Sequence, residues 1–164
     1  MGNEKFFEEV VDGKELSEWH RIAVSDKTTE AQLLKVAEKC AGIKSFFRIN
    51  ERKEDAIEIA LAISKNPNCT DKVLKALASS KFPEVWRLIA RSEKAREGSL
   101  EEVAKKCATI KYYYKEFDNR LFAIGLANIL YENSNSSQNV MKEILNSRFP
   151  EVVAIGLKWI KYNA

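Results

Sequence analysis

The chain has 164 residues, of which 45% are hydrophobic and 31% are charged, so it is long enough to bury a core and too apolar to be disordered throughout. Its 27 Lys and Arg residues and 24 Asp and Glu residues leave a net charge of +3, which neither requires nor excludes a polyanionic partner. No stretch approaches the ~18 apolar residues of a membrane-spanning helix, and residues 1–5 lack the basic segment and apolar run of a signal peptide. We therefore expect a cytoplasmic protein without a membrane partner.

The scarcity of helix-breaking residues, with three prolines and six glycines, favours an all-helical chain. Thr29 and Ser99 precede runs of helical periodicity, and Ser99 is followed by Glu102 at the spacing of a capping box. Pro83 and Pro150 occupy positions where a first helical residue tolerates proline. No strand pattern competes. The predicted helices lie near 4–12, 17–25, 29–41, 51–64, 71–80, 83–94, 99–108, 119–132, 137–147 and 150–162.

The sequence resembles itself at an offset of 67 residues. Cys40 aligns with Cys107, and Lys-Phe-Pro-Glu-Val at 81–85 returns as Arg-Phe-Pro-Glu-Val at 148–152. Such self-similarity is the signature of a repeat architecture, in which each unit buries its apolar face against its neighbours. The prediction is an all-α fold, a short right-handed α-solenoid of about ten stacked antiparallel helices. It forms a single domain, residues 1–164, with a partial repeat 1–28, a repeat 29–95 and a repeat 96–164.

One stretch of this pattern resembles a known repeat family. Residues 62–78 are similar to the variant leucine-rich repeat, which reads as an Asn-Pro-Asn-x-Thr turn, here 66–70, followed by a Leu-x-x-Leu-Ala helix, here 74–78. The helix that begins at Pro83 is similar to the partner helix of that family and to HEAT-like repeats. The resemblance implies a curved stack of helices used for macromolecular recognition, and it transfers no catalytic residue.

Two aromatic and basic segments follow the aligned cysteines, and they are the predicted binding site. If the second segment is helical, its three consecutive tyrosines span about 200° of the circumference, so one buried stripe cannot cover them all. Tyrosine and arginine are typical of binding hot spots and also suit phosphate contact with base stacking. The alternative is a bulky linker that fills the gap between repeats. The predicted binding residues are Phe46, Phe47, Arg48, Lys111, Tyr112, Tyr113, Tyr114, Lys115 and Arg120.

Signs of catalysis and of metal binding are absent from the sequence. None of the common nucleotide-binding, metalloprotease or hydrolase motifs is present. His20 is the single histidine and aligns with Arg87, while carboxylates such as Asp55 and Glu58 fit a solvated helix face. We therefore expect no enzyme activity, no cofactor and no metal. The cysteines are odd in number, lack a CxxC pair and should be free buried thiols: Cys40, Cys69 and Cys107.

Two of the tryptophans bear on packing. Trp19 and Trp86 are equivalent at the offset of 67, so we expect both in the core, the alternative being exposed rings that stack on bases.

The last predicted helix, at 150–162, is apolar over more than half of its circumference, which is more than one neighbour can cover. It predicts a homodimer formed through this helix, or else a terminal segment that buries itself.

The predicted function is a non-enzymatic binding scaffold, a HEAT-like helical-repeat module that recognises a protein partner. Nucleic acid is the alternative partner, because HEAT-like repeats include DNA glycosylases that hold a duplex against a basic surface. No aspartate and tryptophan constellation of those enzymes can be carried over to this chain. Acidic residues also interrupt the most basic stretch, which comprises Arg87, Arg91, Lys94, Arg96, Lys105, Lys106, Lys111, Lys115 and Arg120.

Overall fold

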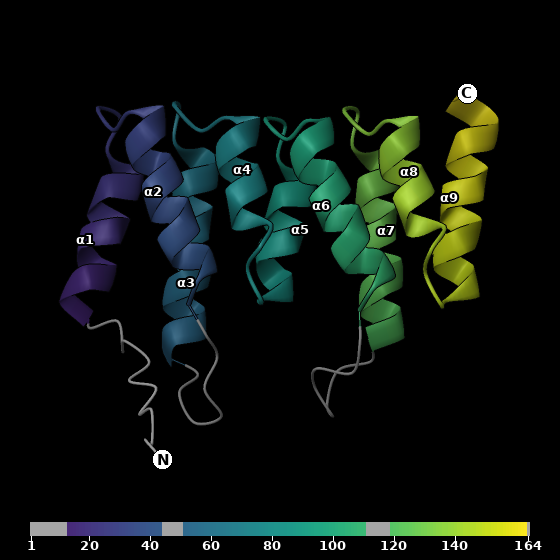
Figure 1. The fold of residues 1–164 in the computed structure, drawn as a ribbon, viewed down its shortest axis with the longest axis horizontal. Helices are drawn as coiled ribbons and strands as arrows, with labels where there is room; N and C mark the ends of the chain where they lie inside the picture. The colour runs from purple at the N-terminus through teal and green to yellow at the C-terminus, as the bar shows by residue number, and fades with distance from the viewer. Residues whose placement is uncertain (1–12, 44–50, 111–118, 164) are drawn as a thin grey trace, which may run out of the picture.

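The computed structural model describes residues 13–43, 51–110 and 119–163 (Figure 1). All regular secondary structure within these ranges is α-helical, which confirms the all-α prediction for this part of the chain. The first predicted helix, 4–12, lies outside the described residues. The described helices are α1 (Gly13–Val24), α2 (Glu30–Ala41), α3 (Glu51–Lys65), α4 (Asp71–Leu77), α5 (Pro83–Arg91), α6 (Glu97–Ala108), α7 (Asn119–Glu132), α8 (Gln138–Ile144) and α9 (Pro150–Asn163).

Each described helix coincides with one predicted helix, and the differences lie at the ends. α1 begins earlier than predicted, and α4, α5 and α8 end earlier. After α4 the Ser80 hydroxyl accepts a hydrogen bond from the backbone N–H of Phe82 at 3.2 Å, and Ser147 does the same for Phe149 after α8, also at 3.2 Å. These local bonds compete with helical hydrogen bonding and turn the chain towards the next helix.

The beginning of α6 corrects the prediction that Ser99 caps this helix. α6 begins at Glu97, so Ser99 lies inside its first turn. The cap comes instead from Asp71 at the start of α4, whose Oδ1 accepts hydrogen bonds from the backbone N–H groups of Arg96 at 2.7 Å and Ser99 at 3.2 Å. The Ser99 hydroxyl donates to the same oxygen at 2.6 Å. A cap supplied by a neighbouring helix has no local sequence signature, which is why the spacing rule missed it.

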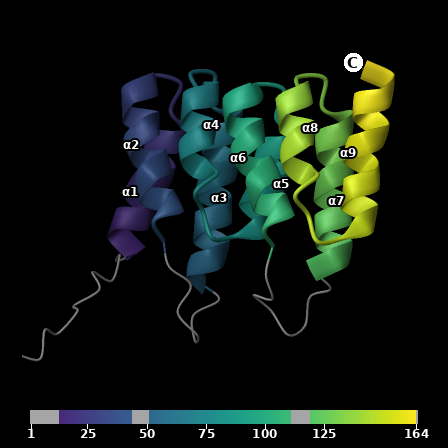
Figure 2. The same ribbon diagram turned by 45° about the vertical axis from the view of Figure 1, so that its right-hand side comes forward.

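The helices form two rows (Figures 1 and 2). Helices α1, α3, α5, α7 and α9 contact one another in that order, and we call them the odd row. Helices α2, α4, α6 and α8 likewise contact one another in order and form the even row. Successive helices run in opposite directions, and α1 and α9 lie at opposite ends of the array. None of the described helices is both long and apolar enough to cross a bilayer.

The core lies between the two rows and takes large side chains from both. Fully buried residues of the even row include Leu33, Leu74, Leu77, Leu100, Met141 and Ile144. Those of the odd row include Ile59, Ile63, Ile89 and Leu126. Since each row presents its apolar stripe to the other, hydrophobic burial holds the array together along its whole length.

Trp19 and Trp86 belong to this core, as predicted. Each tryptophan is only 5% exposed, so neither ring is available for stacking on a base. The indole N–H of Trp86 donates to the carbonyl oxygen of Ser80 at 2.8 Å, which satisfies its polar atom. The ammonium groups of Lys39 and Lys106 lie 5.4 and 5.7 Å from the Trp19 and Trp86 ring centroids, so each ring also has a cation beside it.

Asparagine side chains connect the loops at one end of the array, at the top of Figure 1. The Asn66 side chain, after α3, donates to the carbonyl oxygens of Ala23, at the end of α1, and Ser25, just after α1, both at 2.8 Å. Asn133, after α7, makes the equivalent bonds to two carbonyl oxygens at the end of α5, at 2.7 and 3.4 Å. Lys94, in the loop after α5, donates to the carbonyl oxygen of Asn66. We call this chain of contacts through four successive loops the asparagine ladder.

Candidate binding surface

Only one of the predicted binding residues lies within the described ranges. That residue is Arg120, which is exposed in α7 and forms an ion pair with Glu151 at the start of α9. The hydrogen bond from Arg120 holds the pKa of the Glu151 carboxyl below its usual range. Lys53 and Glu84 form the equivalent ion pair between α3 and α5, at 2.5 Å. Arg120 therefore joins two helices of the odd row. The predicted residues that lie outside the described ranges are Phe46, Phe47, Arg48, Lys111, Tyr112, Tyr113, Tyr114 and Lys115.

Large hydrophobic side chains that remain exposed all belong to the odd row, within the described residues. They are Val24 in α1, Leu61 in α3, Leu121 in α7, and Leu157 and Tyr162 in α9. Exposed positions of the even row carry mainly polar and charged side chains, including Lys35, Lys72, Lys75 and Lys142. Exposed apolar groups that gather on one side of a protein mark an interaction surface more often than scattered ones do. We call the outward surface of the odd row the odd-row face.

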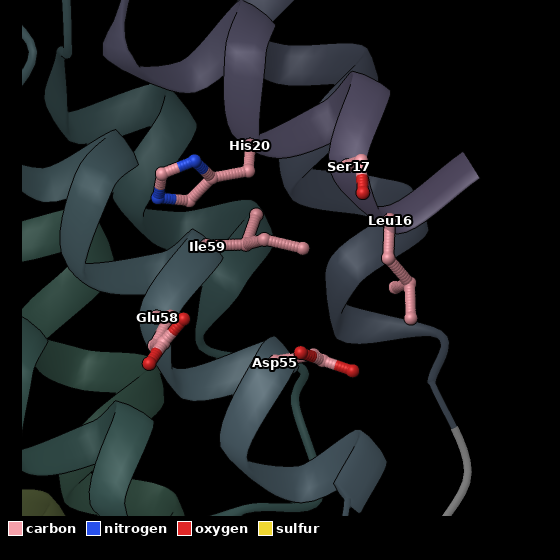
Figure 3. A pocket seen from close by; sticks show the side chains of 6 residues that line it. All are labelled: Leu16, Ser17, His20, Asp55, Glu58 and Ile59. Atoms are coloured by element: carbon pink, nitrogen blue, oxygen red, sulfur yellow. The ribbon is translucent and has the colours of Figure 1, made fainter. Parts of the chain in front are cut away.

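A hollow of about 380 Å³ opens between α1 and α3 on this row, and Figure 3 shows the side chains that line it. Leu16, Ser17 and His20 come from α1, and Asp55, Glu58 and Ile59 come from α3. Ile59 projects between the two helices, with His20 on one side of it and the two carboxylates on the other (Figure 3). The α1–α3 pocket thus combines an apolar floor with two acidic groups and an imidazole.

The three titratable groups of the α1–α3 pocket are not used to hold the fold. His20, Asp55 and Glu58 form no hydrogen bond and no ion pair within the part of the chain that the structure describes. They also do not converge as metal ligands would, since no group of three His, Cys, Asp or Glu side chains in the described ranges could hold an ion. His20 lacks the oriented partners of a general base. Two carboxylates that line one hollow favour a ligand that carries positive charge.

A comparison of the residues that align at the offset of 67 could have revealed this pocket from the sequence. Sequence reasoning assigned Asp55 and Glu58 to a solvated helix face and His20 to no site. At that offset the histidine aligns with an arginine, and both carboxylates align with uncharged residues. A change of charge at three equivalent positions is a local departure from the repeat.

A second hollow of about 380 Å³ lies between α3 and α5, nearer the asparagine ladder. Leu61 and Leu88 supply apolar surface, and Lys65 and Arg91 supply positive charge. Glu93 and Lys94 from the adjoining loop also line it. This α3–α5 pocket has the opposite charge balance to the α1–α3 pocket, so the odd-row face offers two sites of different character.

The basic residues singled out in the sequence are divided among different parts of the surface. Arg87, Arg91 and Arg120 lie on the odd row, Lys105 lies on the even row, and Lys94 lies in a loop of the asparagine ladder. Several of them are already engaged, since Lys105 pairs with Glu102 at 3.0 Å. Arg96 donates to backbone carbonyl oxygens in its own loop. The described members of the set are therefore shared between the two rows and the loops, which does not favour a single stripe along a phosphate backbone.

The cysteines are buried and free, as predicted. Cys40 and Cys107 donate to the carbonyl oxygens of Ala56 and Ala123 at 3.3 and 3.4 Å, contacts that are again 67 residues apart. Burial raises the pKa of the Cys40 and Cys107 thiols to about 12 and that of the Cys69 thiol to about 11. Protonated, enclosed thiols are poor nucleophiles and poor metal ligands, so these residues serve packing.

Comparison of the chain with family models, with curated proteins and with solved structures finds no significant match.

Proposed function

We propose that the chain is a short right-handed α-solenoid that acts as a non-enzymatic binding module for a protein partner. The single observation that carries the proposal is the confinement of exposed large hydrophobic side chains to the odd row. A protein partner suits a surface that alternates apolar side chains, polar pockets and charges of both signs, because such surfaces are typical of non-obligate interfaces.

Two further observations support a solenoid-type module. The helices pack in two ordered rows, and the same side-chain contacts recur 67 residues apart at Asn66 and Asn133, at Cys40 and Cys107, and in the two interhelical ion pairs. Helical-repeat arrays of this kind bury one side of each helix against its neighbours and leave an extended outer surface for recognition.

Site-specific photo-cross-linking tests the proposal. A photo-reactive phenylalanine analogue replaces Leu61 or Leu157 on the odd row, and in matched controls it replaces the exposed Lys72 or Lys142 on the even row. We expect discrete cross-linked protein products from the odd-row positions in cells that express the chain, and none from the even-row positions. Equal labelling from both rows, or no product from the odd row, would contradict the proposal.

Nucleic acid is the second candidate partner, and the α3–α5 pocket with Lys65 and Arg91 is the observation that favours it. Fluorescence anisotropy of labelled duplex and single-stranded DNA, measured at increasing salt, separates the two partners. Binding through several phosphates weakens steeply with salt, because bound counterions are released. We expect no such binding, since the described basic residues are divided between the two rows and the loops. A steep salt dependence that Arg91→Ala reduces would favour nucleic acid instead.

A further inference from the structure

The groove between α1 and α3 has a counterpart in the same molecule, between α5 and α7. Both pairs are neighbours in the odd row, and the two pairs are related by the offset of 67. The three charged or titratable positions of the α1–α3 pocket correspond to residues of quite different chemistry in the second groove. His20, Asp55 and Glu58 correspond to Arg87, Phe122 and Gly125 respectively.

In the α5–α7 groove the chain supplies a guanidinium group of its own. The guanidinium carbon of Arg87 lies 4.2 Å from the centroid of the Phe122 ring, within the range of a cation–π contact. Gly125 lies beneath the same group, and a Cβ added there would stand 3.5 Å from an Arg87 terminal nitrogen. The groove between two odd-row helices can therefore hold an arginine side chain. In the α5–α7 groove that side chain is Arg87 of the chain itself.

The α1–α3 groove has no arginine at the equivalent position. It has instead the carboxylates of Asp55 and Glu58, which can accept hydrogen bonds from one. His20 is shorter than arginine, and the groove contains the hollow of about 380 Å³. Asp55 replaces the aromatic ring and Glu58 replaces the glycine, so α3 contributes two carboxylates where α7 contributes none. A hollow that is lined by two carboxylates favours a ligand with positive charge.

Two cations next to the pocket residues in sequence are paired elsewhere. Arg21, beside His20 in α1, pairs with Glu18 at 2.7 Å. Lys53 in α3 pairs with Glu84 of α5 at 2.5 Å, on the side of α3 that faces α5. Asp55 and Glu58 form no ion pair in the described residues, so both carboxylates remain available to a ligand.

We infer that the α1–α3 pocket receives the guanidinium group of an arginine side chain from the protein partner. A guanidinium presents five N–H donors in one plane and can bond two carboxylates at once, which an ammonium group does less well. Leu16 and Ile59 offer apolar surface for the aliphatic part of the arginine. This inference rests on the proposed function and specifies the chemistry that the partner brings to one site.

The probe for this inference is Nα-acetyl-arginine amide, titrated into the ¹⁵N-labelled full chain and followed by amide chemical shifts. We expect saturable shifts confined to residues of α1 and α3, with a Kd on the order of 1 mM, as befits so small a ligand. The lysine analogue should bind more weakly, and the uncharged citrulline analogue should cause no saturable shift. Absence of saturable shifts with the arginine probe, or equal shifts with citrulline, would overturn the inference.

Three variants locate the site. Asp55→Asn combined with Glu58→Gln should weaken arginine binding about tenfold or more, because two charge-assisted hydrogen bonds are lost. The matched control Glu54→Gln changes an exposed carboxylate of α3 that does not line the pocket, and should leave binding unchanged. His20→Arg places a guanidinium where Arg87 stands in the other groove, and should block the probe while the chain stays folded.

Undiminished binding in the double variant or in His20→Arg would place the probe elsewhere and overturn the inference. Cross-linking from Leu61 and Leu157 does not require this pocket, so the two proposals can fail separately. Retained cross-linking without arginine binding removes the arginine site alone. Loss of odd-row cross-linking removes the protein-binding module itself.

Discussion

Asn66 shows how a single polar residue can hold two helical units together. Its side chain is 3% exposed and donates two hydrogen bonds to backbone carbonyl oxygens at the end of α1 and in the loop that follows α1. Its own side-chain oxygen accepts the backbone N–H of Asn68 at 2.9 Å, so every polar atom of the amide is satisfied. A buried amide with all its partners contributes to specificity as well as stability, because few other arrangements could satisfy it.

Asn66→Ala should therefore lower the free energy of unfolding by about 3 kcal/mol, since it leaves buried backbone groups without partners. Urea unfolding followed by tryptophan fluorescence measures the change. Asn128→Ala is the matched control, because Asn128 is exposed on α7 and should cost less than about 0.5 kcal/mol. Equal effects of the two substitutions would contradict the role given to the asparagine ladder.

Burial of the thiols makes stability depend on pH in the alkaline range. Cys107 stays protonated in the folded chain because burial raises its pKa to about 12, whereas an unfolded thiol ionises near pH 9. Above that pH the unfolded state binds fewer protons, so stability falls as pH rises.

This linkage predicts a loss of about 1.5 kcal/mol per thiol between about pH 8 and about pH 10. Urea unfolding of wild-type protein and of Cys107→Ala, with reductant present, isolates the effect as the difference between two pH profiles. The variant should be less stable at neutral pH because of the cavity, and its stability should fall less steeply with pH. Parallel profiles would show that the Cys107 thiol ionises alike in both states.

At the scale of the helix, the sequence predicts which elements exist better than where they begin. Apolar residues recur at helical spacing, and a local signal such as the capping box of Thr29 and Gln32 marks the start of α2 correctly. The beginning of α6 escapes such reasoning because its cap, Asp71, belongs to another helix. An end that is fixed by tertiary contact cannot be found from local spacing.

α9 is fixed against α8 by a close approach at Gly156. A Cβ added at this position would lie 2.8 Å from Leu145 Cδ2 and 3.1 Å from the carbonyl oxygen of Met141. Gly156→Ala should therefore destabilise the chain by about 2 kcal/mol, despite the better helix propensity of alanine. Thermal and urea unfolding measure the loss.

Gly125→Ala is the matched control for this helix contact. Only the flexible end of Arg87 approaches a Cβ there, at 3.5 Å, so the substitution should be neutral or should stabilise the chain by up to about 1 kcal/mol. If Gly156→Ala proves as harmless as Gly125→Ala, α9 does not require close contact with α8.

On the scale of the whole molecule, the candidate site depends on which helices are neighbours. His20 and Asp55 are far apart in sequence and line the same hollow because α1 packs beside α3 within a row. The repeat offset aligns equivalent residues, but it does not say which helices lie side by side. For this reason Asp55 was predicted as part of a solvated helix surface, and the hollow that it lines was not foreseen.

Self-association through the C-terminal helix also belongs to the whole molecule and remains a prediction. Leu157 and Tyr162 are 55% and 67% exposed on α9, at the end of the odd row. Sedimentation velocity should show a concentration-dependent dimer that Leu157→Glu abolishes without lowering the melting temperature, because this side chain lies outside the core. Ala31→Glu, an exposed change on α2, should leave the dimer intact. A monomer at every concentration would contradict the prediction.

The asparagine ladder makes one end of the array stiffer than the other. Hydrogen bonds from Asn66 and Asn133 to the backbone, which are buried or partly buried, hold the loop end together, whereas the two ion pairs at the starts of odd-row helices are partly exposed and weaker. Bending should therefore separate the odd-row helices most at the end away from the asparagine ladder. Spin labels at positions 14 and 54 should accordingly report a broader distance distribution than labels at 27 and 65. A ligand bound between two odd-row helices would then set the curvature of the array.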